Sequence, residues 1–119
     1  MNIIGIIGTR RRDSGEDYKK VEKAFLSIYK KGDGIISGGC SKGGDRFAEL
    51  ISEKFHICLK IYPANWSLGK HAGFLRNTDI AKNSTKLIAC VAKDRTGGTE
   101  DTIKKFLKFN TKDNLLLVE

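Results

Sequence analysis

Residues 35–46 read Ile-Ile-Ser-Gly-Gly-Cys-Ser-Lys-Gly-Gly-Asp-Arg and join a short β-branched run to an amphipathic segment through four glycines. Glycine lets the backbone adopt positive φ angles and lets a ligand approach the main chain closely. A strand that passes through a tight glycine-rich turn into a helix points backbone N–H groups and a positive dipole end at one spot. The stretch therefore predicts a strand, a helix and, between them, an anion site of the kind that most often takes phosphate.

Strand and helix signals alternate along the rest of the chain. Apolar runs with a β-branched bias predict strands at 3–7, 34–37, 57–62, 86–91 and 115–118. Apolar residues at helical spacing predict helices at 17–31, 45–55, 71–82 and 99–109. Such alternation implies βαβ units, and right-handed crossovers favour a five-stranded parallel sheet in the order 3-2-1-4-5. The expected fold is one three-layer, Rossmann-like α/β domain over residues 1–119, with helices on both faces of the sheet.

The loops at one edge of this expected sheet carry most of the chemistry. Ligands of such sheets sit outside the carboxyl ends of the strands, where the strand order reverses, which here lies between the first and fourth strands. All four expected strand-to-helix loops are chemically rich, whereas the helix-to-strand loops are short. This asymmetry predicts a functional site at the carboxyl edge.

The composition is that of a globular protein, with 39% hydrophobic and 30% charged residues. No run approaches the ~18 apolar residues of a membrane span, and the N-terminus indicates a first strand rather than a secretion signal. Three cysteines, Cys40, Cys58 and Cys90, make an odd number without metal-ligand spacing. We therefore expect a cytoplasmic protein with reduced thiols, Cys58 and Cys90 buried in strands, no membrane contact, no metal and no cofactor.

The net charge of +8, from 22 Lys and Arg against 14 Asp and Glu, favours anionic partners. It does not choose between a nucleotide, a nucleic acid and an acidic protein. Most lysines, such as Lys19 and Lys23, fall on the expected outer faces of helices, where solvation is a sufficient explanation for them.

The first loop contains three adjacent arginines after the first strand. Gly8 ends the strand where the backbone passes near a ligand, Thr9 offers a hydroxyl, and Arg10 offers a planar fork for phosphate. Three neighbouring arginines cannot all face one pocket, so we expect Arg10 to point inward and Arg11 or Arg12 to lie in solvent or on a polyanion. A solvated basic loop is the alternative.

The glycine-rich second loop is not a Walker A motif. Gly38 and Gly43 have the required spacing, but Gly44 and Asp45 replace the Lys and Ser or Thr that follow in that motif. The G-x-G-x-x-G dinucleotide pattern is also absent from this loop. Asp45 has two interpretations: it caps the helix, or it accepts a hydrogen bond from a ribose hydroxyl or orients Arg46.

The third loop, residues 63–77, is long for a strand-to-helix connection, and long ordered loops are often functional. Trp66 either stacks on a base or covers the core. Lys70 and Arg76 add positive charge. His71 is either a general acid or base or a hydrogen-bonding surface residue.

The fourth loop, residues 93–99, ends in a second glycine pair before a helix. Thr99 is a favourable N-cap residue, and the Glu100 carboxylate suits the first helical turn. Gly97, Gly98 and the N–H groups that follow Thr99 form a second possible anion cradle. Two such helix N-termini at one cleft are able to hold two ends of a phosphorylated ligand.

Together these segments resemble the SLOG superfamily, which is named for the DNA-processing protein DprA and the cytokinin-activating LOG enzymes, and in particular its small YspA-like branch. The resemblance spans nearly the whole chain. It rests on four segments: Gly8-Thr9-Arg10; Ser37-Gly38-Gly39 with Gly43-Gly44-Asp45-Arg46; Pro63-Ala64, Trp66, Gly69-Lys70, Ala72-Gly73 and Arg76-Asn77; and Gly98-Thr99.

The resemblance implies a Rossmannoid fold that binds nucleotides or nucleotide-derived ligands, in some members as a sensor. LOG members are phosphoribohydrolases with the motif Pro-Gly-Gly-x-Gly-Thr-x-x-Glu. In an alignment on Gly98 and Thr99, this chain has Asp-Arg-Thr at 94–96 in place of Pro-Gly-Gly, and Thr102 in place of the catalytic Glu. The LOG catalytic motif is therefore not preserved, whereas Arg76 is suited to the phosphate- or transition-state-binding role of the LOG arginine.

The leading prediction is a domain that binds a small nucleotide-like ligand, with a homodimer as a possible assembly. One alternative is a nucleotide N-glycosidase or phosphoribohydrolase on the same site, with Asp45 and Arg76 as candidate catalytic residues. The other is a nucleic-acid-binding module, as DprA relatives suggest. The residues expected to contact the ligand are Gly8, Thr9, Arg10, Ser37, Gly38, Gly39, Gly43, Gly44, Asp45, Arg46, Trp66, Lys70, Arg76, Asn77, Gly97, Gly98 and Thr99.

Overall fold

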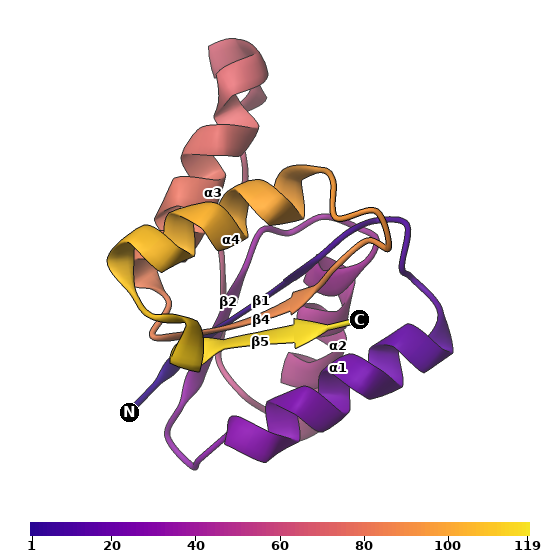
Figure 1. The fold of residues 1–119 in the computed structure, drawn as a ribbon. Helices are drawn as coiled ribbons and strands as arrows, with labels where there is room; N and C mark the ends of the chain where they lie inside the picture. The colour runs from indigo at the N-terminus through magenta and orange to yellow at the C-terminus, as the bar shows by residue number, and fades with distance from the viewer.

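The computed structural model describes residues 1–119, apart from the side chain of Lys70. Five parallel strands form one sheet in the order β3-β2-β1-β4-β5, which confirms the expected topology (Figure 1). The strands are β1 (Ile3–Gly8), β2 (Gly34–Ser37), β3 (Leu59–Ile61), β4 (Lys86–Cys90) and β5 (Leu115–Val118).

Two pairs of helices cover the two faces of this sheet, so the expected three-layer α/β architecture is confirmed (Figure 1). Helices α1 (Gly15–Ile28) and α2 (Gly44–Phe55) lie on one face, and α3 (Ala72–Asn83) and α4 (Gly98–Phe109) lie on the other. Two short 3-10 helices, η1 (Trp66–His71) and η2 (Lys112–Asn114), precede α3 and β5. Among the described residues, no helix has the length and apolar character needed to cross a membrane.

Alternating residues of the central strands fill two separate cores, because successive side chains of a strand point to opposite faces. On one face, β1 and β4 contribute Ile4, Ile6, Ile88 and Cys90, which pack against α1 and α2. On the other face lie residues such as Ile7, Leu87 and Ala89, which pack against α3 and α4. The helices contribute Val21, Phe25, Phe47, Ala48 and Ile51 to the first core and Ile80, Ala81, Ile103 and Phe106 to the second.

The first residue of α1 and the N-cap residues of α2 and α4 differ from the expectation. Helix α1 begins two residues early because Ser14 and Asp17 form a capping box, in which each side chain accepts a hydrogen bond from the other residue's backbone N–H, at 3.1 and 3.4 Å. Thr99 was expected as an N-cap, and capping was one of the two interpretations of Asp45; neither residue is an N-cap. The N-caps are Gly43 and Gly97, whose φ angles of +74° and +106° favour glycine.

The expectation that Cys58 is buried in a strand is also wrong. Cys58 is exposed, because the edge strand β3 begins one residue later, at Leu59. Cys90 is buried in β4 as expected, and burial raises the pKa of its thiol. The difference follows from position, since β4 is a central strand and β3 lies at the sheet edge.

Candidate functional site

A pocket of about 410 Å³ opens at the carboxyl ends of β1 and β4, where the strand order reverses. We call it the switch-point pocket. It is built from the loops that follow β1, β2 and β4 together with the inner faces of α3 and α4. Its lining consists of Ile7, Gly8, Thr9, Arg10, Arg11, Cys40, Asp45, Arg76, Asn77, Ile80, Gly97, Gly98, Thr99 and Thr102.

Most of the expected site residues from the first and fourth loops meet in this pocket, and Asp45, Arg76 and Asn77 join them. The remaining expected residues do not line it: Ser37, Gly38, Gly39, Gly43, Gly44, Arg46 and Trp66. Lys70 was also expected there, but its side chain lies outside the described part of the chain. Sequence reasoning missed the lining residues Ile7, Arg11, Cys40, Ile80 and Thr102, although Thr102 follows Thr99 by three residues and so shares its helix face.

The N-terminus of α2 lies directly against the end of β1. A Cβ atom on Gly44 would collide with the carbonyl carbon of Ile7 and the amide nitrogen of Gly8. A Cβ on Gly8 would lie 2.8 Å from the Cβ of Cys90 and 3.0 Å from the Gly44 amide nitrogen. Gly44 therefore serves close backbone packing, and Cys40 is the residue by which the second loop itself lines the pocket.

Helix α4, in contrast, presents its first turn to the pocket. Gly97, Gly98 and Thr99 all belong to the lining. Within the described residues, the backbone N–H groups of Gly98 and Thr99 donate to no acceptor, while the N–H of Glu100 donates to the Gly97 carbonyl at 3.2 Å. Free N–H groups at a helix N-terminus and the positive end of the helix dipole favour an anion at this wall.

Asp45 holds the glycine-rich turn together from inside. Its Oδ2 accepts a hydrogen bond from the Cys40 backbone N–H at 3.0 Å, and its Oδ1 lies 2.8 Å from the Ser37 hydroxyl. That hydroxyl also lies 2.7 Å from the Ile6 carbonyl and donates to one of the two acceptors at a time. Asp45 is only 8% exposed, yet it belongs to the pocket lining, and its carboxylate oxygens have lone pairs beyond those used in these contacts.

Arg76 reaches from α3 to the same turn. Its Nη1 donates to the Gly38 carbonyl at 2.9 Å, and its Nε donates to Oδ1 of Asn77 at 3.1 Å. A Cβ on Gly38 would lie 2.6 Å from this Nη1 and 2.8 Å from Oδ2 of Asp45, so the cation and the carboxylate flank the Gly38 backbone. Nη2 of Arg76 has no hydrogen-bond partner among the described residues and remains able to bind a ligand.

Asn77 connects Arg76 to the first turn of α4. Its Nδ2 donates to the Gly98 carbonyl at 3.3 Å and to Oδ2 of Asp101 at 3.2 Å, while its Oδ1 accepts from Arg76. Lys105 forms an ion pair with the same Asp101 oxygen at 2.9 Å. The buried amide of Asn77 therefore fixes the relative position of the α4 N-terminus and the Arg76 guanidinium.

The three adjacent arginines have three different environments. Arg10 lines the pocket, and its side chain makes no hydrogen bond to any described group. Arg11 crosses to the loop after β4, where Nη1 pairs with Asp94 at 2.9 Å and Nη2 donates to the Thr96 carbonyl at 3.0 Å. Arg11 thus bridges two loops that border the pocket while its side chain stays 53% exposed, in agreement with the expectation that Arg11 or Arg12 lies in solvent.

Arg12, in contrast, is largely withdrawn from solvent, and its contacts are structural. Nη1 donates to the carbonyls of Val91 at 3.1 Å and Val118 at 2.8 Å, beside the ends of β4 and β5. The guanidinium also pairs with Asp17 of α1 at 2.9 Å, and both side chains are 16% exposed. Arg12 therefore ties two strand ends and a helix to the first loop.

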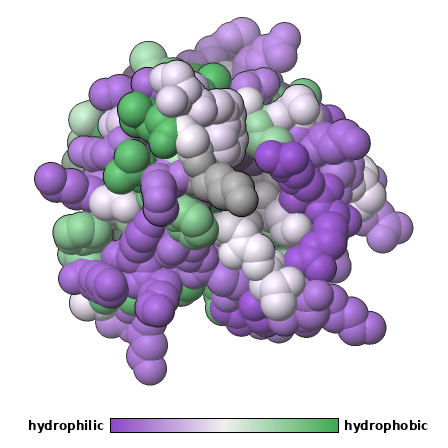
Figure 2. Space-filling model, turned by 90° about the horizontal axis from the view of Figure 1, so that it is seen from above, coloured by the Kyte–Doolittle hydropathy of each residue, from purple (hydrophilic) through white to green (hydrophobic). Residues whose placement is uncertain are grey.

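Arg46 and Trp66 lie away from the pocket lining. Arg46 donates to Oδ1 of Asp13 at 2.8 Å, an oxygen that also accepts the Gly43 N–H at 2.7 Å. These two hydrogen bonds, that from Gly43 first, lower the pKa of Asp13. Trp66 is 64% exposed, and its ring lies over Gly73. A Cβ atom built on Gly73 would be 3.5 Å from the ring. Trp66 belongs to the segment formed by η1 and the start of α3, which protrudes at the top of Figure 1 and faces the viewer in Figure 2.

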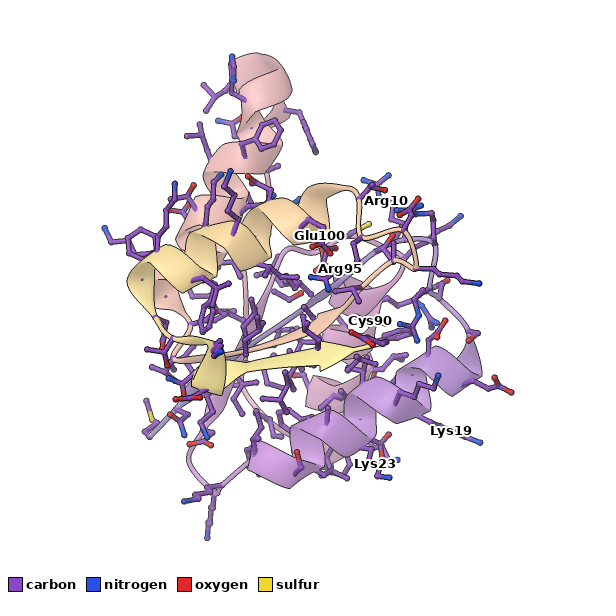
Figure 3. The ribbon with its side chains drawn as sticks, in the orientation of Figure 1. Arg10, Lys19, Lys23, Cys90, Arg95 and Glu100 are labelled. Atoms are coloured by element: carbon purple, nitrogen blue, oxygen red, sulfur yellow. The ribbon has the colours of Figure 1, made fainter. Side chains whose placement is uncertain are left out.

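The pocket is cationic. Arg10, Arg11 and Arg76 belong to its lining, against the single carboxylate of Asp45. Figure 3 shows Arg10 beside the start of α4, whereas Lys19 and Lys23 project from α1 on the far side of the sheet. The nearby Arg95 is occupied by Glu100, with Nε 2.8 Å from the carboxylate. Because Arg11 is likewise paired, with Asp94, the lining arginines without a carboxylate partner among the described residues are Arg10 and Arg76.

The chain matches no protein-family model, no curated protein and no solved structure. In the part of the chain that the structure describes, no group of three or more His, Cys, Asp or Glu side chains is placed to hold a metal ion. The functional argument therefore rests on the geometry and charge of the switch-point pocket.

Proposed function

We propose that the chain binds a nucleotide or a nucleotide-derived phosphate ligand in the switch-point pocket. The observation that carries the proposal is the meeting of the free first turn of α4 with two guanidinium groups, those of Arg10 and Arg76, in one lining. Backbone N–H groups at a helix N-terminus and arginine forks are the two protein groups best matched to phosphate oxygens.

The phosphate is assigned to the space between the α4 turn and the arginines. The N–H groups of Gly98 and Thr99 and the Nη2 of Arg76 are the donors without an acceptor among described residues. Arg10 closes the outer side, because it is exposed and unpaired among those residues. An anion there neutralises cations that otherwise face one another across the pocket.

Thr102 supports a binding role over LOG-type hydrolysis. It stands at the position of the LOG catalytic glutamate, and it lines the pocket with its hydroxyl 3.3 Å from the Gly98 carbonyl. A threonine hydroxyl supplies no carboxylate for acid or base chemistry. We therefore retain SLOG-like membership and a sensor role as proposals, together with a cytoplasmic location and a homodimer.

The test is thermal denaturation of the purified chain with nucleoside mono- and diphosphates, cyclic nucleotides, ADP-ribose and NAD, because a ligand of the folded state raises the midpoint. We expect Arg10→Ala to weaken the binding of a stabilising compound by at least ~10-fold, the value of one charge-assisted hydrogen bond. Lys19→Ala is the matched control, since it removes an exposed cation of α1. Equal losses in both variants, or stabilisation only by oligonucleotides that disappears in high salt, would reject this site.

A further inference from the structure

We propose that the switch-point pocket recognises the sugar phosphate of its ligand and makes no contact that distinguishes one base from another. The inference rests on the proposed function and specifies which part of the ligand the protein contacts. The ligand class is accordingly a pentose 5-phosphate, alone or as the common part of any nucleoside monophosphate.

The first observation is that aromatic side chains are absent from the pocket lining as described. The chain has six Phe, three Tyr and one Trp. Phe25, Phe47 and Phe106 are fully buried in the two cores, and Trp66 and Phe74 are 64% and 53% exposed outside the lining. Tyr18, Tyr29, Phe55 and Tyr62 pack against the cores, and Phe109 is exposed on α4. A base bound without sequence readout is usually held by stacking on such rings, and none is available here.

The apolar part of the lining does not replace an aromatic platform. It consists chiefly of Ile7 and Ile80, which are 4% and 1% exposed and belong to the core between the sheet and α3. So little of each side chain reaches the pocket that neither offers a flat surface to a planar ring. The carboxyl end of β1 otherwise contributes Gly8, which has no side chain, and Thr9 follows it with a short hydroxyl side chain.

The polar part of the lining suits the hydroxyl groups of a sugar. Oδ2 of Asp45 accepts the Cys40 N–H, Oδ1 is within hydrogen-bond distance of the Ser37 hydroxyl, and both oxygens retain a lone pair for a further donor. Thr99 is 9% exposed and lines the pocket, and its hydroxyl has no hydrogen-bond partner among the described residues. A carboxylate acceptor and a hydroxyl beside an anion cradle match adjacent ribose hydroxyls and their phosphate.

The size of the pocket agrees with this assignment. Its volume of about 410 Å³ lies near the lower end of the range of roughly 300–1,000 Å³ in which small-molecule sites fall. Arg11 limits its extension toward the loop after β4, because its hydrogen bonds to Asp94 and Thr96 close that side. A sugar phosphate fits within this volume.

The experiment is titration calorimetry of the whole chain with ribose 5-phosphate, AMP, GMP, CMP, UMP, adenosine and inorganic phosphate. We expect ribose 5-phosphate and the four nucleotides to bind with dissociation constants within ~3-fold of one another, because they share every proposed contact. Adenosine should show no binding, because it lacks the phosphate, and inorganic phosphate should bind at least ~10-fold more weakly, because it lacks the sugar hydroxyls.

Two variants sharpen the test. Thr99→Val keeps the shape of the side chain and removes the hydroxyl, so it should weaken ribose 5-phosphate and AMP equally, by ~3–10-fold. Trp66→Ala should leave both affinities unchanged, since Trp66 lies outside the lining.

Preference for one nucleotide by more than ~10-fold over ribose 5-phosphate, or loss of AMP binding in Trp66→Ala, would overturn the inference and leave the proposed function standing. Failure of every phosphorylated compound to bind would overturn both. Binding of inorganic phosphate as tight as that of ribose 5-phosphate would limit the site to the anion alone and reject the sugar contacts.

Discussion

Asn77 donates a hydrogen bond across 3.3 Å to the carbonyl of Gly98, so that a buried amide of α3 holds the first turn of α4. This turn carries the backbone N–H groups to which the phosphate is assigned. The position of these N–H groups therefore depends on Asn77, whose side-chain amide already uses its donor and its acceptor within the protein.

Replacement of Asn77 by Ala should lower both stability and phosphate affinity. The change leaves the Arg76 Nε without its acceptor and removes one of the hydrogen bonds to the Gly98 carbonyl, which costs about 1–3 kcal/mol in the free energy of unfolding. Urea unfolding and calorimetry with AMP measure the two effects. Asn83→Ala is the control on the same helix, because Asn83 is exposed and bonds only within α3; its effect should stay within ~0.5 kcal/mol.

Gly44 and Gly15 form a matched pair for testing backbone packing. A Cβ on Gly44 collides with the backbone of β1, whereas a Cβ on Gly15 meets no atom within 4 Å. We expect Gly44→Ala to lower the thermal midpoint sharply or to prevent folding. Gly15→Ala should be neutral or stabilising, by ~0.4–1 kcal/mol, because it restricts the unfolded chain. Similar midpoints for the two variants would contradict the close approach of α2 to β1.

The acid stability of the chain should depend on Asp94. Hydrogen bonds from Arg11 and then Thr96 lower the pKa of this carboxyl from 3.8 to about 2. Because the folded-state pKa is the lower one, the carboxylate stabilises the fold above the unfolded value, and this contribution is lost as the pH falls through the folded value. Asp94→Asn should therefore flatten the dependence of stability on pH between ~4 and ~2.

The measurement for Asp94 is the midpoint of urea unfolding across that acid range. Asp113→Asn is the control, since Asp113 is exposed and its carboxylate makes no hydrogen bond to a described residue. An acid limb of unchanged slope in Asp94→Asn would show that the contact with Arg11 does not persist in solution.

The three cysteines should react with a thiol reagent at three different rates. Cys58 is exposed and should label first, whereas Cys90 is buried with a raised pKa and should label only on unfolding. Cys40 is half-buried in the pocket lining, so ribose 5-phosphate should slow its labelling selectively. Serine substitutions, one cysteine at a time, assign each phase. Protection of Cys58 instead of Cys40 would place the ligand elsewhere.

The fold was predictable from the sequence because its signals are local. Apolar runs of strand length, apolar residues at helical spacing and glycines between them indicated every strand and α-helix, although not the short 3-10 helices η1 and η2. The preference for right-handed crossovers then led to the observed strand order. Cys58 escaped this reasoning because an apolar run does not reveal how much of it pairs. Only the position of β3 at the edge explains why Cys58 lies in solvent.

The candidate site was predictable in its loops and less so in its side chains. Arg10, Asp45 and Arg76 meet as expected, because the carboxyl ends of parallel strands converge on one edge. The environments of Arg11 and Arg12 depend on partners 83 and 106 residues away, Asp94 and Val118. Neighbouring residues give no information about such partners, so three consecutive arginines look alike until the fold is known.

The bond from Arg12 to the carbonyl of Val118 also sets an order of events during synthesis. The first loop, which carries Arg10, is made early, but its anchor is among the last residues of the sheet. Contacts between segments so distant along the chain form late in folding. A nascent chain that has emerged only as far as β4 should therefore lack a finished pocket, and ligand capture should begin only after residue 118 has left the ribosome.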